Sequence, residues 1–69
     1  MKEFTITLNG DRRTVPAPIS LAGLLDHLGL DPRAVVVEQN RGIVRRPSLA
    51  DTPVADGDVI ELVHFVGGG

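Results

Sequence analysis

The first residues of the chain alternate between apolar and polar side chains. In residues 4–8 the apolar side chains are separated by threonines, and this period of two is typical of a half-buried strand. Asn9-Gly10 follows at once, and both residues tolerate the positive φ of a type I′ turn. The pattern predicts a hairpin whose second strand covers residues 11–15 and is ended by Pro16 and Pro18, which cannot donate to a ladder.

The next segment predicts one short helix. Leucines recur at the i, i+3, i+4 and i+7 positions of a single helical face, namely Leu21, Leu24, Leu25 and Leu28. Ser20 precedes them as the expected N-cap, and Gly29 supplies the left-handed residue that commonly follows a helix. Because so short a helix must bury its leucines against something, we expect it to pack on the sheet.

The second half of the chain predicts further strands and no second long helix. The apolar segments are residues 34–38, 43–44 and 59–65, and residues 40–42 turn the chain between the first two. Residues 45–53 are irregular, with Leu49 expected in the core and Ser48 expected to cap one helical turn.

The segment before the last strand reads as a tight turn. Gly57 takes its strained position, and Asp56 and Asp58 are expected to bond their own backbone in preference to a metal ion.

The order of elements indicates the α+β class. The first and last strands are both strongly apolar, and placing them side by side at the centre of the sheet gives the β-grasp (ubiquitin-like) arrangement. We therefore expect a mixed four- to five-stranded sheet packed on one helix. Residues 1–66 form this domain, and residues 67–69 are expected to be a flexible glycine tail.

The composition excludes several classes of function. The chain has 69 residues and no cysteine, which excludes disulfides, thiolate metal sites and a cysteine nucleophile. A net charge of −2 with two aromatic residues is a poor match to a nucleic-acid binder. No apolar run is long enough to span a membrane, and the N-terminus does not resemble a signal peptide. A cytoplasmic protein is expected.

Residues 56–69, which end in Gly67-Gly68-Gly69, resemble the C-terminus of the ThiS family, the sulfur carriers of thiamine biosynthesis. The resemblance extends to Leu8-Asn9-Gly10, Val37-Glu38-Gln39-Asn40 and Ile43-Val44-Arg45-Arg46, and so covers essentially the whole chain.

The resemblance implies a β-grasp fold and a chemical role for Gly69. In the family the terminal glycine carboxylate is adenylated by a ThiF-type adenylyltransferase that uses ATP. A persulfide sulfur donor then displaces AMP to leave a thiocarboxylate, and a ThiG-type thiazole synthase takes the sulfur. By this resemblance the chain is a protein cosubstrate that binds no cofactor, and it is not itself an enzyme.

The residues agree with that role independently. Glycines at 67 and 68 lack a Cβ, so the tail can enter a narrow slot. Four residues from Val66 reach about 13 Å when extended. Because the chain has no cysteine, the carboxylate of Gly69 is the one place where sulfur can be carried. A Walker-type loop is also missing from the sequence, so ATP must be bound by the partner.

Residues beside the tail are candidates for docking on partners. If the alternation is strict, Val63 and Phe65 lie on the face opposite Ile60 and Leu62 and form an apolar patch continuing to Val66; a bulge would instead return them to the core.

Basic residues offer a second candidate surface. Arg41, Arg45 and Arg46 are either a solvated edge or partners for acidic groups of the activating enzyme. His64 is expected to be a strand residue with one side in water. No metal site is predicted.

Three alternatives share part of this evidence. The small subunit of molybdopterin synthase also ends in Gly-Gly on a β-grasp, and a carrier for tRNA thiolation would use the same chemistry. A β-grasp binding module, whose glycine tail has no chemistry, belongs to a different class.

Overall fold

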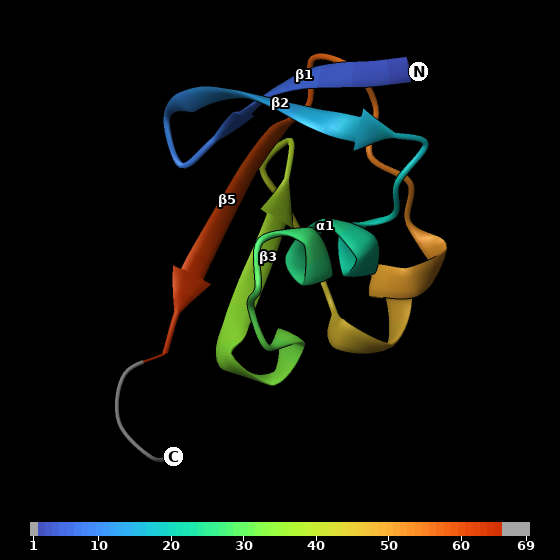
Figure 1. Cartoon of the computed structure of the whole chain (residues 1–69). Coiled ribbons are helices and arrows are strands. Elements are labelled where there is room, and N and C mark those ends of the chain that lie inside the picture. Colours follow the sequence, from blue (N-terminus) through green and yellow to red (C-terminus); the bar gives the residue numbers. More distant parts are fainter. Residues whose placement is uncertain (1, 66–69) are drawn as a thin grey trace.

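The fold is a single sheet whose helical segments lie on one side. The computed structural model describes residues 2–65. Its elements are β1 (Lys2–Leu8), β2 (Asp11–Ala17), α1 (Leu21–His27), η1 (Pro32–Ala34), β3 (Val35–Gln39), β4 (Gly42–Val44), η2 (Arg46–Asp51) and β5 (Val59–His64), where η denotes a 3-10 helix. The five strands have the order β2-β1-β5-β3-β4, and β1 and β5 pair in parallel at the centre (Figure 1). This is the predicted mixed sheet packed on one helix.

The hairpin forms as predicted, but its second strand is longer. Asn9 and Gly10 have φ values of 48° and 86°, as a type I′ turn requires. The prediction that the strand ends at Pro16 is wrong, because Pro16 pairs with Glu3 and β2 continues to Ala17. Proline is tolerated there since β2 is an edge strand, and one side of its backbone has no partner strand to which it must donate.

The helix has both predicted ends. The Ser20 hydroxyl accepts a hydrogen bond from the Gly23 N–H at 3.0 Å, and Gly29 has a φ of +74°. Gly23 also allows a close approach, because a Cβ there would lie 2.9 Å from Cγ1 of Ile19. None of the helices in residues 2–65 has the length and apolar character to cross a bilayer.

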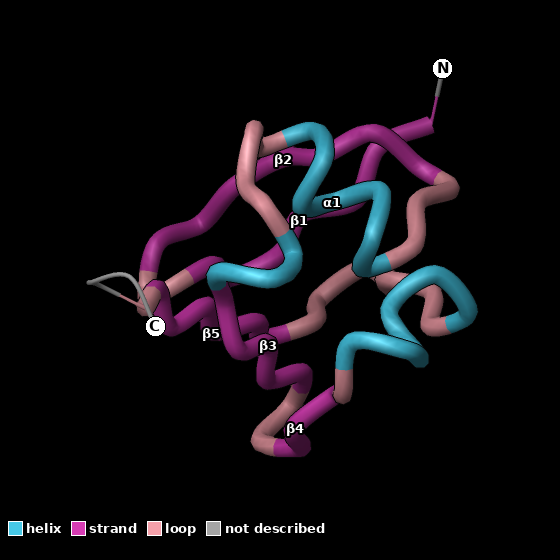
Figure 2. Tube along the Cα trace, turned by 90° about the horizontal axis from the view of Figure 1, so that it is seen from below, coloured by secondary structure: helices cyan, strands magenta, loops and turns pink. Residues whose placement is uncertain are grey.

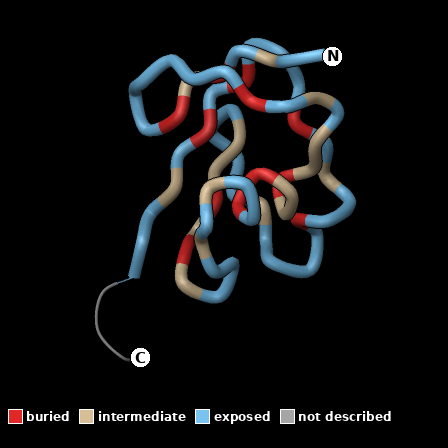
Figure 3. Tube along the Cα trace, in the orientation of Figure 1, coloured by how far each residue is buried: buried red, intermediate tan, exposed pale blue. Residues whose placement is uncertain are grey.

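The core fills the space between the sheet and the helical segments (Figure 3). Its buried apolar residues are Ile6, Leu8, Val15, Leu21, Leu24, Leu25, Val35, Val37, Leu49, Val54 and Ile60. Leu49 lies in the core, as predicted. The prediction that Ser48 caps a helical turn is wrong, because η2 begins after Arg45 with no side-chain cap. A proline lies in the first turn of η2. Because proline has no N–H, this turn has one backbone donor fewer that a cap would have to satisfy.

Within residues 2–65, one face of the sheet carries no helix. Seen from below, α1, η1 and η2 all lie on the same side of β5, β3 and β4 (Figure 2). Residues alternate along a strand between the two faces, so each strand contributes side chains to the core and to this second face. We call the second face the open face.

Candidate functional site

The last strand directs the chain towards the predicted tail. β5 lies between β1 and β3 and ends at His64. The predicted end of the apolar patch (Val66), the tail and the reactive carboxylate all lie outside the described residues. The tail residues are Gly67, Gly68 and Gly69. The described part of the candidate site is the segment that precedes the tail, from Asp58 to Phe65.

Asp58 fixes the beginning of β5. Its side chain is 8% exposed, and its Oδ2 accepts hydrogen bonds from the Ala55 N–H at 2.8 Å and Gln39 Nε2 at 2.9 Å. Its Oδ1 accepts from Asn40 Nδ2 at 3.0 Å, and Asn40 Oδ1 in turn accepts from the Val59 N–H at 2.9 Å. This network joins the β3–β4 turn to the start of β5.

The hydrogen bonds also set the charge state of Asp58. Burial alone would raise the pKa of this carboxyl, because a charged group is disfavoured away from water. The bonds from Ala55, Asn40 and Gln39 outweigh burial, and they hold the pKa of Asp58 below its ordinary value of 3.8. Asp58 is thus an ionised structural residue at neutral pH.

The turn before β5 partly agrees with its prediction. Asp58 bonds its own turn at Ala55, as expected. For Asp56 the prediction is wrong, because its Oδ1 accepts from the Thr5 N–H at 2.7 Å. The Gly57 N–H donates to the Thr5 carbonyl at 2.8 Å, so the turn packs on β1 and Asp56 finds a donor there. Residues 2–65 contain no group of carboxylates and histidines able to hold a metal ion.

Asn9 fixes the middle of β5. Its backbone N–H donates to the Ile60 carbonyl at 2.9 Å, which continues the parallel ladder between β1 and β5. Its side chain bonds β5 further along the strand. Oδ1 accepts a hydrogen bond from the Leu62 N–H at 2.7 Å, and Nδ2 donates one to the Leu62 carbonyl at 3.2 Å. The amide replaces the next peptide of β1, where the backbone has already turned away.

The end of β5 is bonded on one side only. The Phe65 N–H donates to the Ala34 carbonyl at 2.8 Å, and His64 pairs with Val35 of β3. On the β1 side, the hydrogen bonds among the described residues stop at Leu62. His64 is exposed, as expected, and it borders a groove of about 350 Å³ with Arg13, Leu28 and Leu30 among its lining residues.

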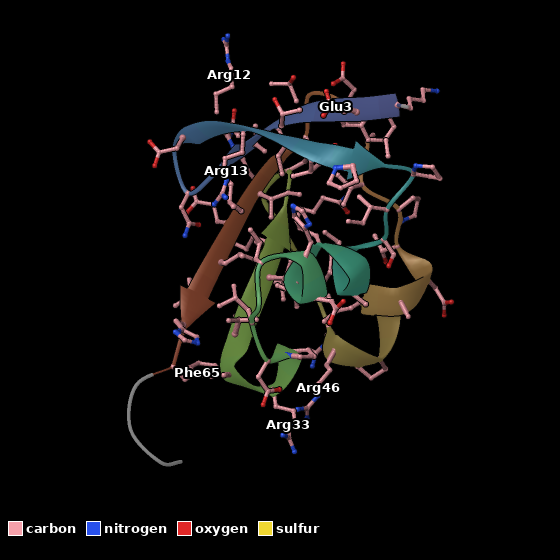
Figure 4. The ribbon with its side chains drawn as sticks, viewed as in Figure 1. Glu3, Arg12, Arg13, Arg33, Arg46 and Phe65 are labelled. Carbon is pink, nitrogen blue, oxygen red and sulfur yellow. The ribbon has the colours of Figure 1, made fainter. Side chains whose placement is uncertain are left out.

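Val63 and Phe65 lie on the open face. They are 51% and 57% exposed, whereas Ile60 is fully buried and Leu62 is half-buried. Strict alternation is therefore confirmed, and no bulge returns Val63 or Phe65 to the core. Figure 3 shows β5 passing from buried to exposed towards its end, and Figure 4 shows Phe65 there. A docking role for this patch stays a prediction.

The predicted arginines lie at different places along the sheet. Arg41 lies in the β3–β4 turn, next to Asn40, whose N–H donates to the Val59 carbonyl at the start of β5. Arg41 is therefore at the opposite end of β5 from Phe65. Arg45 and Arg46 follow β4 at the sheet edge and are exposed, and Figure 4 shows Arg46 near Arg33 at the lower end of the molecule.

Sequence reasoning missed the residues that hold β5 in place. Asn9 and Asn40 read only as turn residues, and Gln39 only as the end of a strand. Their partners on and beside β5 are 53 and 19 residues away in sequence. The available signal was an asparagine in each of the two turns that lie beside β5 in the sheet, the β1–β2 turn and the β3–β4 turn. Its meaning depends on the strand register.

Known proteins resemble this chain in sequence and in fold. The ThiS family model matches residues 6–69. The sulfur carrier protein ThiS of Bacillus subtilis is 40% identical over 50 residues, which cover 72% of this chain and 76% of that protein. The crystal structure of the thiamine biosynthesis protein (ThiS) from Geobacter metallireducens superposes with a TM-score of 0.82 at 33% identity, covering 96% of this chain and 100% of that one.

Longer proteins also contain a similar segment. A thiazole synthase of Paramagnetospirillum magneticum is 44% identical over 64 residues, which cover 93% of this chain. The chain spans 20% of the length of that protein and of a second thiazole synthase, from Magnetococcus marinus. The family match covers nearly every described residue and agrees with the fold. The chain therefore belongs to the ThiS family.

Proposed function

We propose that this chain is a sulfur carrier of thiamine biosynthesis and that Gly69 bears the reactive carboxyl group. The observation that carries the proposal is the family match, which runs through residue 69. The identity with the Bacillus subtilis carrier and the likeness to the Geobacter structure support the same role. The chain acts as a protein cosubstrate, and the partner enzymes supply the catalytic groups.

Activation of the carboxyl group is the first chemical step. A carboxylate is a poor electrophile, because its leaving group would be oxide. A ThiF-type adenylyltransferase therefore joins the carboxylate oxygen to the α-phosphorus of ATP, with release of pyrophosphate, and the resulting mixed anhydride has AMP as a good leaving group. The described part of the chain supplies the base from which the tail enters that enzyme.

Sulfur is installed in the second step. The outer sulfur of a persulfide donor attacks the activated carbonyl carbon, and AMP leaves with the electron pair of the broken C–O bond. The new bond is the C–S bond. A thiol then attacks the donor's own sulfur and cleaves the S–S bond that the donor brought, so the donor leaves as a disulfide with that thiol and the thiocarboxylate stays on Gly69. With no cysteine in the sequence, the sulfur has no competing position on the carrier.

Thiazole synthase is the proposed acceptor of this sulfur. Two proteins named thiazole synthase contain a segment at least 42% identical to this chain. A carrier segment within the protein that uses the sulfur would keep donor and acceptor at high effective concentration.

Intact-mass analysis tests the proposal. The chain is incubated with ATP, the adenylyltransferase and a persulfide source, and we expect a mass gain equal to replacement of one oxygen by sulfur. A reaction without ATP is the control. Deletion of Gly69 should abolish the gain while the unfolding transition stays unchanged. A truncated chain that is still loaded, or a full chain that is never loaded, would contradict the proposal.

A further inference from the structure

The large exposed apolar side chains of residues 2–65 gather on the open face. They are Ile43, Val59, Val63 and Phe65, with exposures between 45% and 68%. Val59, Val63 and Phe65 alternate with the inward residues of β5, and Ile43 of β4 lies directly opposite Glu38 of β3. Apolar groups collected on one uncovered face are typical of a docking surface.

Two carboxylates lie in the middle of this apolar group. Glu38 of β3 and Glu61 of β5 are direct cross-strand partners. Directly opposite residues of an antiparallel ladder alternate between hydrogen-bonded and non-hydrogen-bonded pairs. The Asn40 N–H donates to the Val59 carbonyl, so Asn40 and Val59 are a hydrogen-bonded pair. Glu38 and Glu61 lie two positions further along and are therefore also a hydrogen-bonded pair, with Cα atoms about 5.5 Å apart. Like charges directly opposite each other destabilise a sheet.

The described residues provide no cation for this pair. The ion pair found in residues 2–65 joins Arg33 and Asp31, and neither glutamate has a basic group within ion-pair distance. Val63 and its cross-strand partner Val36 lie on the tail side of the two carboxylates, and Ile43 lies beside Glu38. The acidic pair is thus bordered by apolar side chains.

This arrangement selects the chemistry of a partner. A purely apolar surface that covered the open face would remove water from two carboxylates and leave them without a counter-charge, which is strongly unfavourable. A guanidinium group removes that penalty, because its planar fork of donors can bind both carboxylates at once. A metal ion fits less well, since two carboxylates supply too few of the oxygen ligands that calcium requires.

We propose that the open face docks a protein partner whose contact surface is apolar and carries an arginine that binds Glu38 and Glu61 together. The inference rests on the proposed function, because the partners in question are the adenylyltransferase and thiazole synthase. It adds a polar centre to the apolar patch of Val63 and Phe65. Bringing that arginine to the sheet would align the partner with the strand that leads to the tail.

Binding measurements with a matched control test this inference. The double variant Glu38→Gln with Glu61→Gln removes the acidic pair and keeps its shape. The control, Asp26→Asn with Asp51→Asn, makes the same change in net charge at exposed positions on α1 and η2, on the helical side. Calorimetry is done with each purified enzyme at two salt concentrations.

We expect the glutamate variant to bind at least one enzyme about 10-fold to 100-fold more weakly, as for loss of charged hydrogen bonds. Its affinity should also depend less on salt, and its midpoint of thermal unfolding should equal or exceed that of the wild type, because a repulsion is removed. The control should stay within about twofold of the wild type, since exposed charges away from the contact act only over a screened distance.

Other results would overturn the inference. These are unchanged affinity of the glutamate variant for both enzymes, an equal loss in the control, or a wild-type chain that binds neither enzyme. Concentration-dependent dimerisation of the wild type that the glutamate variant abolishes would assign the face to a second copy instead. Sulfur loading at saturating enzyme separates this result from the proposed function, because the glutamate variant keeps Gly69 and should then load fully.

Discussion

The two halves of β5 are built differently although they belong to one strand. From Val59 to Leu62 the backbone is bonded on both edges, and Ile60 is fully buried. From Val63 to Phe65 the described backbone hydrogen bonds are with the β3 side alone, and Val63 and Phe65 are more than half exposed. One half stabilises the fold, and the other presents a surface.

Side chains create most of this difference. Backbone pairing between β1 and β5 covers only Thr7 with Val59 and Leu8 with Ile60. Asp58 and Asn40 hold the strand before this short ladder, and Asn9 holds it after. Three polar residues therefore set how far β5 is hydrogen-bonded on both edges. The direction in which the chain leaves the sheet is fixed by a strand that is itself only partly paired.

Matched truncations on β5 should show the largest contrast. We expect Ile60→Ala to destabilise the protein by about 2–5 kcal/mol, because it opens a cavity in the core. Val63→Ala, on the open face, should change the free energy of unfolding by less than about 0.5 kcal/mol. Urea denaturation followed by circular dichroism measures both. Similar losses in the two variants would show that β5 has no such division.

Asp58→Asn should have the next largest effect. The new amide brings donors towards Gln39, Asn40 and Ala55, which are themselves donors to Asp58. We expect a loss of about 1–3 kcal/mol in the free energy of unfolding at neutral pH, the cost of unsatisfied buried groups. An undiminished stability would mean that the network does not hold the start of β5.

The pH dependence of the same variant gives an independent test. Because the pKa of Asp58 is lowered in the folded state, its contribution to stability is fully present above the ordinary value of 3.8 and is lost as pH falls through the folded value. The stability difference between wild type and Asp58→Asn should therefore shrink below about pH 4. Denaturation curves between neutral and acidic pH measure this, and a difference that grows on acidification would contradict it.

Asn9→Gly isolates the amide that extends the ladder. Glycine keeps the positive φ of 48° without strain but cannot bond Leu62. Two lost hydrogen bonds should cost about 1–2 kcal/mol. Hydrogen exchange at the Leu62 amide should accelerate more than exchange at Ile60, and equal acceleration at both would argue against a local role. Asn9→Ala is a useful comparison, because it adds left-handed strain of about 1–2 kcal/mol.

Phe65→Ala should have the smallest effect on stability and a clear effect on docking. Phe65 is 57% exposed, so the free energy of unfolding should change by less than about 0.5 kcal/mol. Loss of an aromatic contact should weaken binding to the adenylyltransferase about tenfold, in the range found for interface anchors. Calorimetry with Ile43→Ala as a second variant would show how far the contact extends from the tail across the open face.

Local sequence signals predicted most of the helices and strands. The roles of several residues depend instead on how the strands pair, which the sequence does not give locally. Ser20, Gly29 and the leucines of α1 act within one segment, so their roles can be predicted from neighbouring residues. Pro16 was misjudged because its tolerance depends on β2 being an edge strand. The opposition of Glu38 and Glu61 depends on the pairing of β3 with β5, which no local pattern specifies.

The edges of the sheet have a consequence for behaviour at high concentration. β4 is three residues long, and β2 contains Pro16 with Arg12 and Arg13. Short strands, prolines and charges at sheet edges discourage edge-to-edge stacking between copies, the usual route to β-aggregation. The molecule can therefore keep an apolar face towards solvent without offering a template for fibril growth, and that face stays available for its partners.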